Sequence, residues 1–217
     1  RFDAYVQDEY QINDRFVVSA GIRGNYIVFD QTALENTIIS GQTYVDPLGS
    51  RDYKINTGKL PDAKILLEPR LGFNYRTGSD NQIQVRGGTG VFTGKPPYVW
   101  VSNQVGNNGI LTGFIQADNS RDYRFTPNVS EFIPSTPTLP TSFDIAATDN
   151  NYKFPQVWKS DLALDYRLPF GAIATVELMY NKNVNAVRYF DANLEPAADT
   201  AKFKGPDSRS RFPGSYV

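Results

Sequence analysis

The sequence has no cysteine and no histidine among its 217 residues. Their absence excludes disulfide bonds, thiolate nucleophiles, histidine-based catalytic triads, and zinc sites built on imidazole or sulfur. Neither sign of charge predominates, because 22 lysines and arginines stand against 23 aspartates and glutamates, for a formal net charge of -1. Such a balance gives no electrostatic reason to expect a nucleic-acid partner. We therefore predict no enzyme, no catalytic residues, no cofactor and no metal site.

Long apolar runs are also missing. No stretch reaches the roughly 18 apolar residues that a membrane-spanning helix needs, and the mean hydropathy is -0.42. A transmembrane helix is therefore not expected. A membrane β-barrel remains compatible with these values, because its strands are only half apolar and hardly register in hydropathy averages. What the chain does have in quantity is aromatic residues, with 14 Phe, 13 Tyr and 2 Trp.

Alternation of apolar and polar residues with a period of two predicts an all-β fold. Between Phe16 and Val28, for example, most even positions are apolar, and the odd positions are mostly small, polar or charged. Six segments with this pattern are predicted strands: residues 1–12, 15–28, 66–77, 82–93, 156–168 and 172–185. We expect them to pair in sequence order as an antiparallel up-and-down meander.

The connections between these segments alternate in length. Short turns are expected at residues 13–14, 78–81 and 169–171, whereas residues 30–64 and 94–155 form long polar connections. Loops of this length are uncommon inside compact soluble domains. Outer-membrane barrels, by contrast, have tight periplasmic turns at one rim and long extracellular loops at the other. The asymmetry therefore favours a large transmembrane β-barrel in the outer membrane of a Gram-negative cell.

Aromatic residues recur near both ends of the apolar faces, eight or ten residues apart, in the pairs Phe2/Tyr10, Phe16/Tyr26, Trp158/Tyr166 and Phe170/Tyr180. At about 3.3 Å per residue and a tilt of roughly 45°, these spacings cover about 19 to 23 Å of membrane thickness. Barrels of this class have an apolar band of about 25 Å, bordered by aromatic girdles. The alternative is a soluble β-sandwich, a carbohydrate-binding or adhesin module, in which the same aromatics form the core.

In a barrel, the two faces of each strand meet lipid and lumen. We predict that the lipid-facing residues include Val18, Ile22, Leu164, Val176 and Leu178. The predicted lumen-facing residues are Arg23, Arg86, Asp165 and Glu177. Six strands are too few to close a barrel, because the smallest barrels have about eight. We therefore expect residues 1–217 to be a partial barrel whose remaining strands lie elsewhere in a longer protein.

Four segments in a fixed order carry a family resemblance: Tyr5 to Tyr10, Glu68 to Asn74, Arg86 to Gln104 and Phe154 to Lys159, with Gly205-Pro206-Asp207 near the end. Together they resemble the barrel of TonB-dependent outer-membrane receptors, and they are most similar to the Oar-like branch of Bacteroidetes. The resemblance implies a barrel of about 22 strands that imports a scarce nutrient (a siderophore, oligosaccharide or peptide). It also implies four partners: outer-membrane lipid, an N-terminal plug domain, the remaining barrel strands, and the TonB complex. The plug and the TonB box are absent from residues 1–217.

The second long connection holds the most distinctive candidate site. Pro96 and Pro97 stiffen the chain before two aromatic side chains, and three asparagines follow. Aromatic faces and side-chain amides suit the binding of a sugar or a peptide. The candidate ligand-binding residues of this extracellular loop are therefore Tyr98, Trp100, Asn103, Asn107 and Asn108. The alternative is that Tyr98 and Trp100 anchor the loop at the barrel rim.

Two other groupings are interpreted structurally. Gly87-Gly88-Thr89-Gly90 lacks the Gly-Lys-Ser/Thr ending and the following helix of a phosphate-binding loop. We expect these glycines to allow a bend in a strand or the close approach of another element, such as the plug. The acidic cluster at residues 118–122 lacks the glycine and terminal glutamate of a calcium-binding loop, so a solvated loop is expected there.

Overall fold

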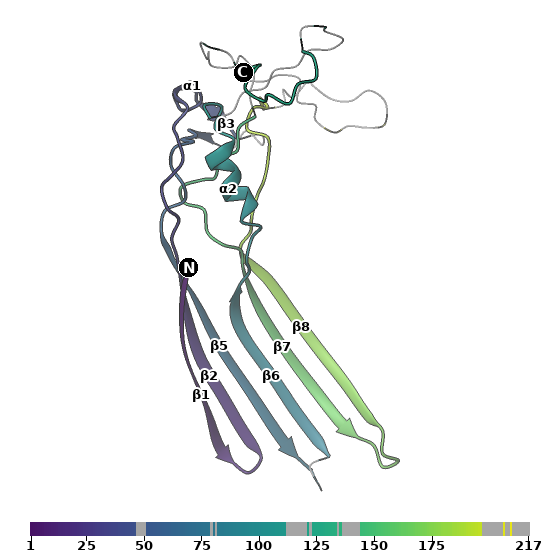
Figure 1. The fold of residues 1–217 in the computed structure, drawn as a ribbon. Coiled ribbons are helices and arrows are strands. Elements are labelled where there is room, and N and C mark those ends of the chain that lie inside the picture. Colours follow the sequence, from purple (N-terminus) through teal and green to yellow (C-terminus); the bar gives the residue numbers. More distant parts are fainter. Residues whose placement is uncertain are drawn as a thin grey trace. The chain divides into compact units, whose positions relative to one another are not determined.

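Six long antiparallel strands form one sheet (Figure 1). The computed structural model describes residues 1–46, 51–78, 80, 82–111, 121, 123–133, 135, 144–196, 206 and 209. The strands are β1 (Phe2–Asn13), β2 (Phe16–Ile27), β5 (Lys64–Thr77), β6 (Ile83–Thr93), β7 (Gln156–Arg167) and β8 (Ile173–Asn185). They neighbour one another in the order β1-β2-β5-β6-β7-β8. The predicted meander is confirmed, and β5 begins at Lys64, slightly before its predicted start.

Tight turns join β1 to β2, β5 to β6 and β7 to β8, as predicted. At the first turn, the side-chain oxygen of Asn13 accepts a hydrogen bond from the Arg15 N–H over 2.9 Å, an arrangement that mimics a backbone turn. At the other two turns, Gly78 and Gly171 adopt φ angles of 87° and 88°. Glycine reaches this left-handed conformation without a Cβ clash, so the turn residues themselves favour the hairpins.

The strand register separates the sheet into two chemically different faces. The apolar face comprises the even-numbered residues of β1, β2, β7 and β8 and the odd-numbered residues of β5 and β6. On it, Val6 lies opposite Ile22, and Leu164 lies opposite both Val85 and Val176. The remaining strand residues form the polar face. Because a shift of one residue would exchange the faces of a whole strand, this pattern strongly specifies the register.

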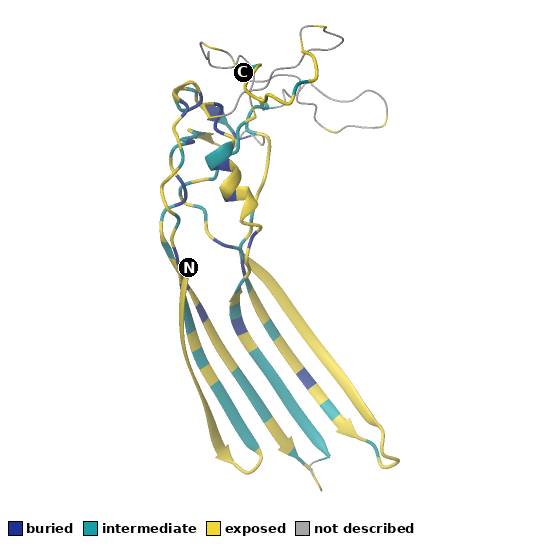
Figure 2. Ribbon diagram, viewed as in Figure 1, coloured by how far each residue is buried: buried dark blue, intermediate teal, exposed yellow. Residues whose placement is uncertain are grey.

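The apolar face and both outer edges of the sheet are open. β1 and β8 are exposed along almost their entire length (Figure 2). Within the described part of the chain, neither strand pairs along its outer edge. On the apolar face, the side chains of Val176 and Leu178 are 71% and 73% exposed. A β-sandwich would cover such a face with a second sheet, so this exposure favours a barrel wall.

The chain divides into two compact units. The sheet unit comprises residues 1–29, 61–97 and 151–189, and the loop unit comprises the described parts of residues 30–60, 98–150 and 190–217. In the sheet unit, buried apolar side chains gather at the strand ends away from the tight turns. Ile27, Leu66 and Phe154 form this cluster, with Phe29 and Tyr152 packed against it. The cluster fastens the sheet where the chain leaves it for the long connections.

The loop unit contains short elements that the sequence pattern did not predict. They are α1 (Thr37–Gly41), the paired strands β3 (Tyr44–Val45) and β4 (Asp52–Tyr53), and α2 (Val99–Gly106). Asn36 caps α1, because its side-chain oxygen accepts hydrogen bonds from the N–H groups of Ile38 and Ile39. The rings of Tyr44 and Tyr53 stack with their centres 5.8 Å apart. Elements this short show no clear period in a sequence window.

Neither helix in the described residues is long and apolar enough to cross a bilayer.

Candidate functional site

The predicted lumen residues, Arg23, Arg86, Asp165 and Glu177, all lie on the polar face. Cross-strand contacts hold most of them in place. Arg23 pairs with Asp3, with 3.1 Å between Nη2 and Oδ2. Arg86 donates from Nε to Asp165 over 3.0 Å, and the Thr175 hydroxyl donates to the other oxygen of Asp165 over 2.7 Å. Charged side chains from β6 and β7 and a hydroxyl from β8 therefore form one bonded group.

A second polar cluster surrounds Glu68, which the sequence analysis did not identify as a site residue. The Glu68 side chain is only 4% exposed. Its carboxylate accepts hydrogen bonds from the Asn25 amide over 2.6 Å, from Arg70 over 2.8 Å, and from the Thr93 N–H over 3.2 Å. Donors from β2, β5 and β6 thus converge on a single carboxylate. Because Asn25 is 43 residues away in the sequence, no local motif signals the cluster.

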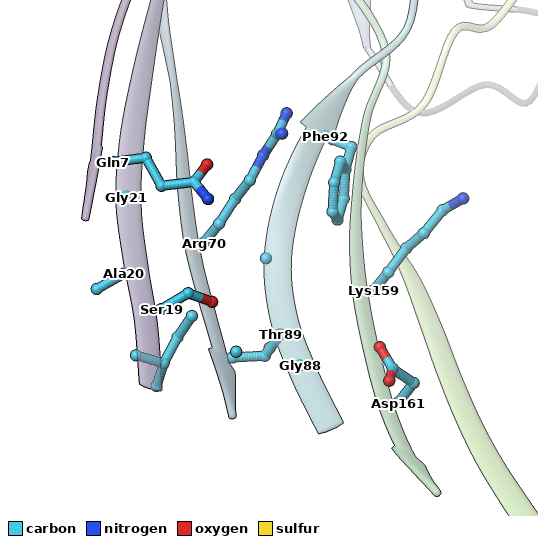
Figure 3. A pocket seen from close by; sticks show the side chains of 13 residues that line it. Gln7, Ser19, Ala20, Gly21, Arg70, Gly88, Thr89, Phe92, Lys159 and Asp161 are labelled. Atoms are coloured by element: carbon cyan, nitrogen blue, oxygen red, sulfur yellow. The ribbon is translucent and has the colours of Figure 1, made fainter. Parts of the chain in front are cut away.

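The polar face also holds a shallow depression of about 370 Å³, lined in part by glycines of β2, β5 and β6 (Figure 3). The Arg70 guanidinium carbon lies 4.7 Å from the ring centre of Phe92, and the Lys159 ammonium nitrogen lies 6.0 Å from it. A Cβ atom on Gly72 would lie 2.8 Å from the Ser19 hydroxyl oxygen. Side chains of neighbouring strands therefore extend across the glycines. The glycines themselves add no side chains to this part of the surface.

Aromatic side chains contact one another near both ends of the apolar face. Three polar side chains on the same face are bonded to one another: the Trp158 indole N–H donates to the Thr89 hydroxyl over 2.7 Å, and that hydroxyl lies 2.7 Å from the Ser160 hydroxyl. Internal bonding of this kind suits a surface in contact with hydrocarbon, where no water is available. The ring-centre distances are 6.5 Å for Phe2–Tyr26 and 6.1 Å for Trp158–Tyr180 near the long connections, and 5.9 Å for Phe16–Tyr75 near the turns.

Four of the five candidate ligand residues are exposed in the loop unit. Tyr98 directly precedes α2 and is 50% exposed, whereas Trp100 lies in the first turn and is 41% exposed. Asn103 lies in the same helix, and Asn107 follows its last residue; both side chains are exposed. The structure therefore places these four residues on one short helix and its two ends.

Asn108 has a different environment from the other candidates. It is fully buried. Its side-chain oxygen accepts hydrogen bonds from the N–H groups of Ile110 and Leu111, and its amide donates to the Val105 carbonyl. Because the side chain is fully buried, it does not reach solvent in this conformation. In this conformation the Asn108 side chain stabilises its own loop, and its role in ligand binding stays a prediction.

The remaining candidate groupings are placed as follows. Residues 87–90 lie within β6, as expected for strand glycines rather than a phosphate-binding loop. The acidic cluster at 118–122 lies outside the described residues except for Arg121, and Gly205-Pro206-Asp207 does so except for Pro206. The described residues include no group of three or more Asp or Glu side chains placed to hold a metal ion.

In the loop unit, burial raises the pKa of the Tyr44 phenol.

A family model described as an outer membrane beta barrel domain matches residues 1–216. The chain belongs to this family. As an outer membrane barrel domain it resides in the outer membrane, in contact with membrane lipid, and the soluble β-sandwich alternative is set aside. The open apolar face of the barrel domain, with its aromatic contacts, has the composition that such a position requires. No curated protein and no solved structure matches the domain significantly.

Proposed function

We propose that this barrel domain forms part of the wall of a TonB-dependent transporter of the Oar-like branch, which imports a scarce nutrient such as a siderophore, an oligosaccharide or a peptide. The observation that carries the proposal is the continuous polar face with its paired charges. Six adjacent strands present it opposite an apolar face. A polar interior behind a lipid-facing surface is what a solute-conducting barrel needs. The ordered sequence segments that resemble this receptor class support it further.

In this proposal, the polar face lines the lumen, with Arg23, Arg86, Asp165 and Glu177 toward the interior. The plug domain and the remaining strands are the partners that complete the barrel, and TonB acts through the plug-bearing part. The shallow depression beside Arg70 and Phe92 gives an inserted domain space near the wall. The Asp165 carboxylate forms an ion pair with Arg86. In a wall that binds and conducts a solute, such a pair needs no catalytic role.

The long connections form the extracellular entrance in this proposal. Tyr98 and Trp100 supply aromatic faces, and Asn103 and Asn107 supply amide donors and acceptors, to a sugar or peptide portion of the nutrient. All four belong to α2 or its ends and are exposed. A helix holds the side chains that would contact the nutrient at a fixed spacing, whereas an extended loop holds them less precisely.

Growth of a deletion strain tests the proposal. Cells lacking the full-length gene are compared with wild-type cells on a ferric siderophore as iron source and on an oligosaccharide or a peptide mixture as carbon source. We expect selective loss of growth on one of these nutrients, and the same loss in a strain that lacks tonB. Growth without defect on all three, or a defect that a tonB deletion does not reproduce, would contradict TonB-dependent import.

A further inference from the structure

Gln104 joins the two long connections inside the loop unit. The side chain is fully buried in α2. Its amide nitrogen donates to the carbonyl oxygens of Thr57 and Lys59 over 2.9 and 3.0 Å. Its amide oxygen accepts a hydrogen bond from the Thr148 N–H over 2.8 Å. One side chain thus uses both amide donors and its oxygen to connect three segments that are distant in the sequence.

Further buried hydrogen bonds connect the same segments beside Gln104. The Asn36 amide donates to the Asn108 carbonyl oxygen over 3.0 Å, and the Asn36 N–H donates to the Thr57 hydroxyl over 2.7 Å. The Thr57 hydroxyl in turn donates to the Leu34 carbonyl over 2.9 Å. Asn36, Thr57 and Asn108 are all buried. Separation of the two connections would therefore leave several buried polar groups without partners.

The packing at Gly58 is equally close. A Cβ atom at this position would lie 2.8 Å from the backbone nitrogen of Glu35 and 3.0 Å from its Cα atom. Backbone atoms cannot move aside as a flexible side chain can, so any larger residue must push residues 57–59 away from residue 35. This close approach lies within the first long connection, where it fixes residues 57–59 against residue 35. The same residues 57 and 59 carry the carbonyl oxygens that accept hydrogen bonds from Gln104.

We propose that Gln104 is a positioning residue that locks residues 98–111 to residues 34–36 and 57–59, so that α2 is held ready in a fixed position within the described part of the loop unit. Without the lock, each long connection would move independently. The lock itself follows from the buried contacts. Its use, which is to present Tyr98 and Trp100 to a nutrient in a fixed arrangement, rests on the proposed function. In this proposal, the entrance is built from both long connections and is already formed before the nutrient binds.

Spin-label distances in the full-length protein in outer membranes test the lock. Labels are attached to cysteines that replace Ile38 in α1 and Ser102 in α2, both exposed. Gln104→Glu keeps the side-chain shape but sets a carboxylate against two carbonyl oxygens. Gln42→Glu is the matched control, because the bond that its side-chain amide donates among the described residues is to the neighbouring Thr43 carbonyl. We expect one narrow distance in the parent and in the control, and loss of that narrow distance in Gln104→Glu.

A second pair of variants disturbs the acceptor side of the lock, because a larger residue at position 58 must displace the Thr57 and Lys59 carbonyl oxygens that Gln104 binds. Gly58→Ala is expected to broaden the distance, whereas Gly41→Ala, which meets no atom within 4 Å, is expected to keep it narrow. Heat-dependent migration on a denaturing gel verifies that each barrel is folded. A narrow, unchanged distance in Gln104→Glu overturns the lock, whatever the result for Gly58→Ala. A broadened distance with unaffected growth on every nutrient supports the lock but removes the ligand role of Tyr98 and Trp100.

Discussion

Glu68 depends on three donors at once. Its carboxylate is nearly buried and accepts hydrogen bonds from Asn25, Arg70 and Thr93. Glu68→Gln keeps the shape but removes the charge and directs N–H groups at existing donors. We expect the free energy of unfolding to fall by about 1 to 3 kcal/mol. Urea titration of the full-length protein in lipid vesicles measures it.

The matched control for this prediction is Glu177→Gln, on the same face but with an exposed side chain. Its effect should stay within about 0.5 kcal/mol, as is usual for surface positions. If Glu68→Gln and Glu177→Gln lower the stability equally, the cluster around Glu68 does not hold the strands together.

At the level of single residues, the sequence predicted the sheet face on which a side chain lies better than it predicted the side chains that it contacts. Alternation assigned Arg86 and Asp165 to the same face, because the period of a strand is two regardless of what lies opposite. It did not reveal that Glu68 is buried, since its donors come from three strands whose register is fixed only by folding. The burial of Asn108 was not predictable for a similar reason. Whether an amide is free for a ligand depends on how its loop closes.

Adjacent residues of β8 test the two faces of the sheet with little change of context. Leu178 lies on the apolar face and Met179 on the polar face, and they are 73% and 71% exposed. We expect Leu178→Lys to cost about 2 to 4 kcal/mol in a bilayer, because it places a charge against lipid near the midplane. Met179→Lys should be much milder, since Asp161 lies opposite it.

The measurement is the folded fraction of each full-length variant in lipid vesicles across a urea series. Equal losses for Leu178→Lys and Met179→Lys would show that the two faces do not meet different environments. A larger loss for Met179→Lys would reverse the assignment and place lipid on the polar face.

Among the elements, the long strands were predictable and the short ones were not. Strands of 11 to 14 residues, such as β6 and β5, repeat their alternation often enough to be recognised, and the turn residues mark their ends. α1 has five residues and α2 has eight, which is too few for a helical period to stand out. Their stability comes from Asn36, Gln104 and Thr57, and therefore from contacts that only the folded connections create.

Orientation in the membrane is a property of the whole molecule. If the tight turns face the periplasm, Phe170 lies on the periplasmic side of the outer membrane, and the long connections lie outside the cell. The chain has no cysteine, so it adds no background to labelling. In the full-length protein, Val129→Cys should react with an impermeant maleimide on intact cells, whereas Phe170→Cys should not. Both positions are well exposed, at 87% and 78%, so the difference reports sidedness.

Permeabilised cells provide the control, because both cysteines should then react. Labelling of Phe170→Cys alone on intact cells would invert the topology and remove the extracellular entrance from the proposed function.

The open edges of β1 and β8 have a consequence for how the complete barrel loses its structure. An edge in hydrocarbon leaves a row of N–H and C=O groups without water to satisfy them, and only a continuous ring has no such row. If one strand detaches, two new edges are exposed to the membrane interior at the same time. Individual strands therefore cannot peel away at a small cost. We expect the ring of strands to unfold in one cooperative transition, in which β1 and β8 unfold together with the strands between them.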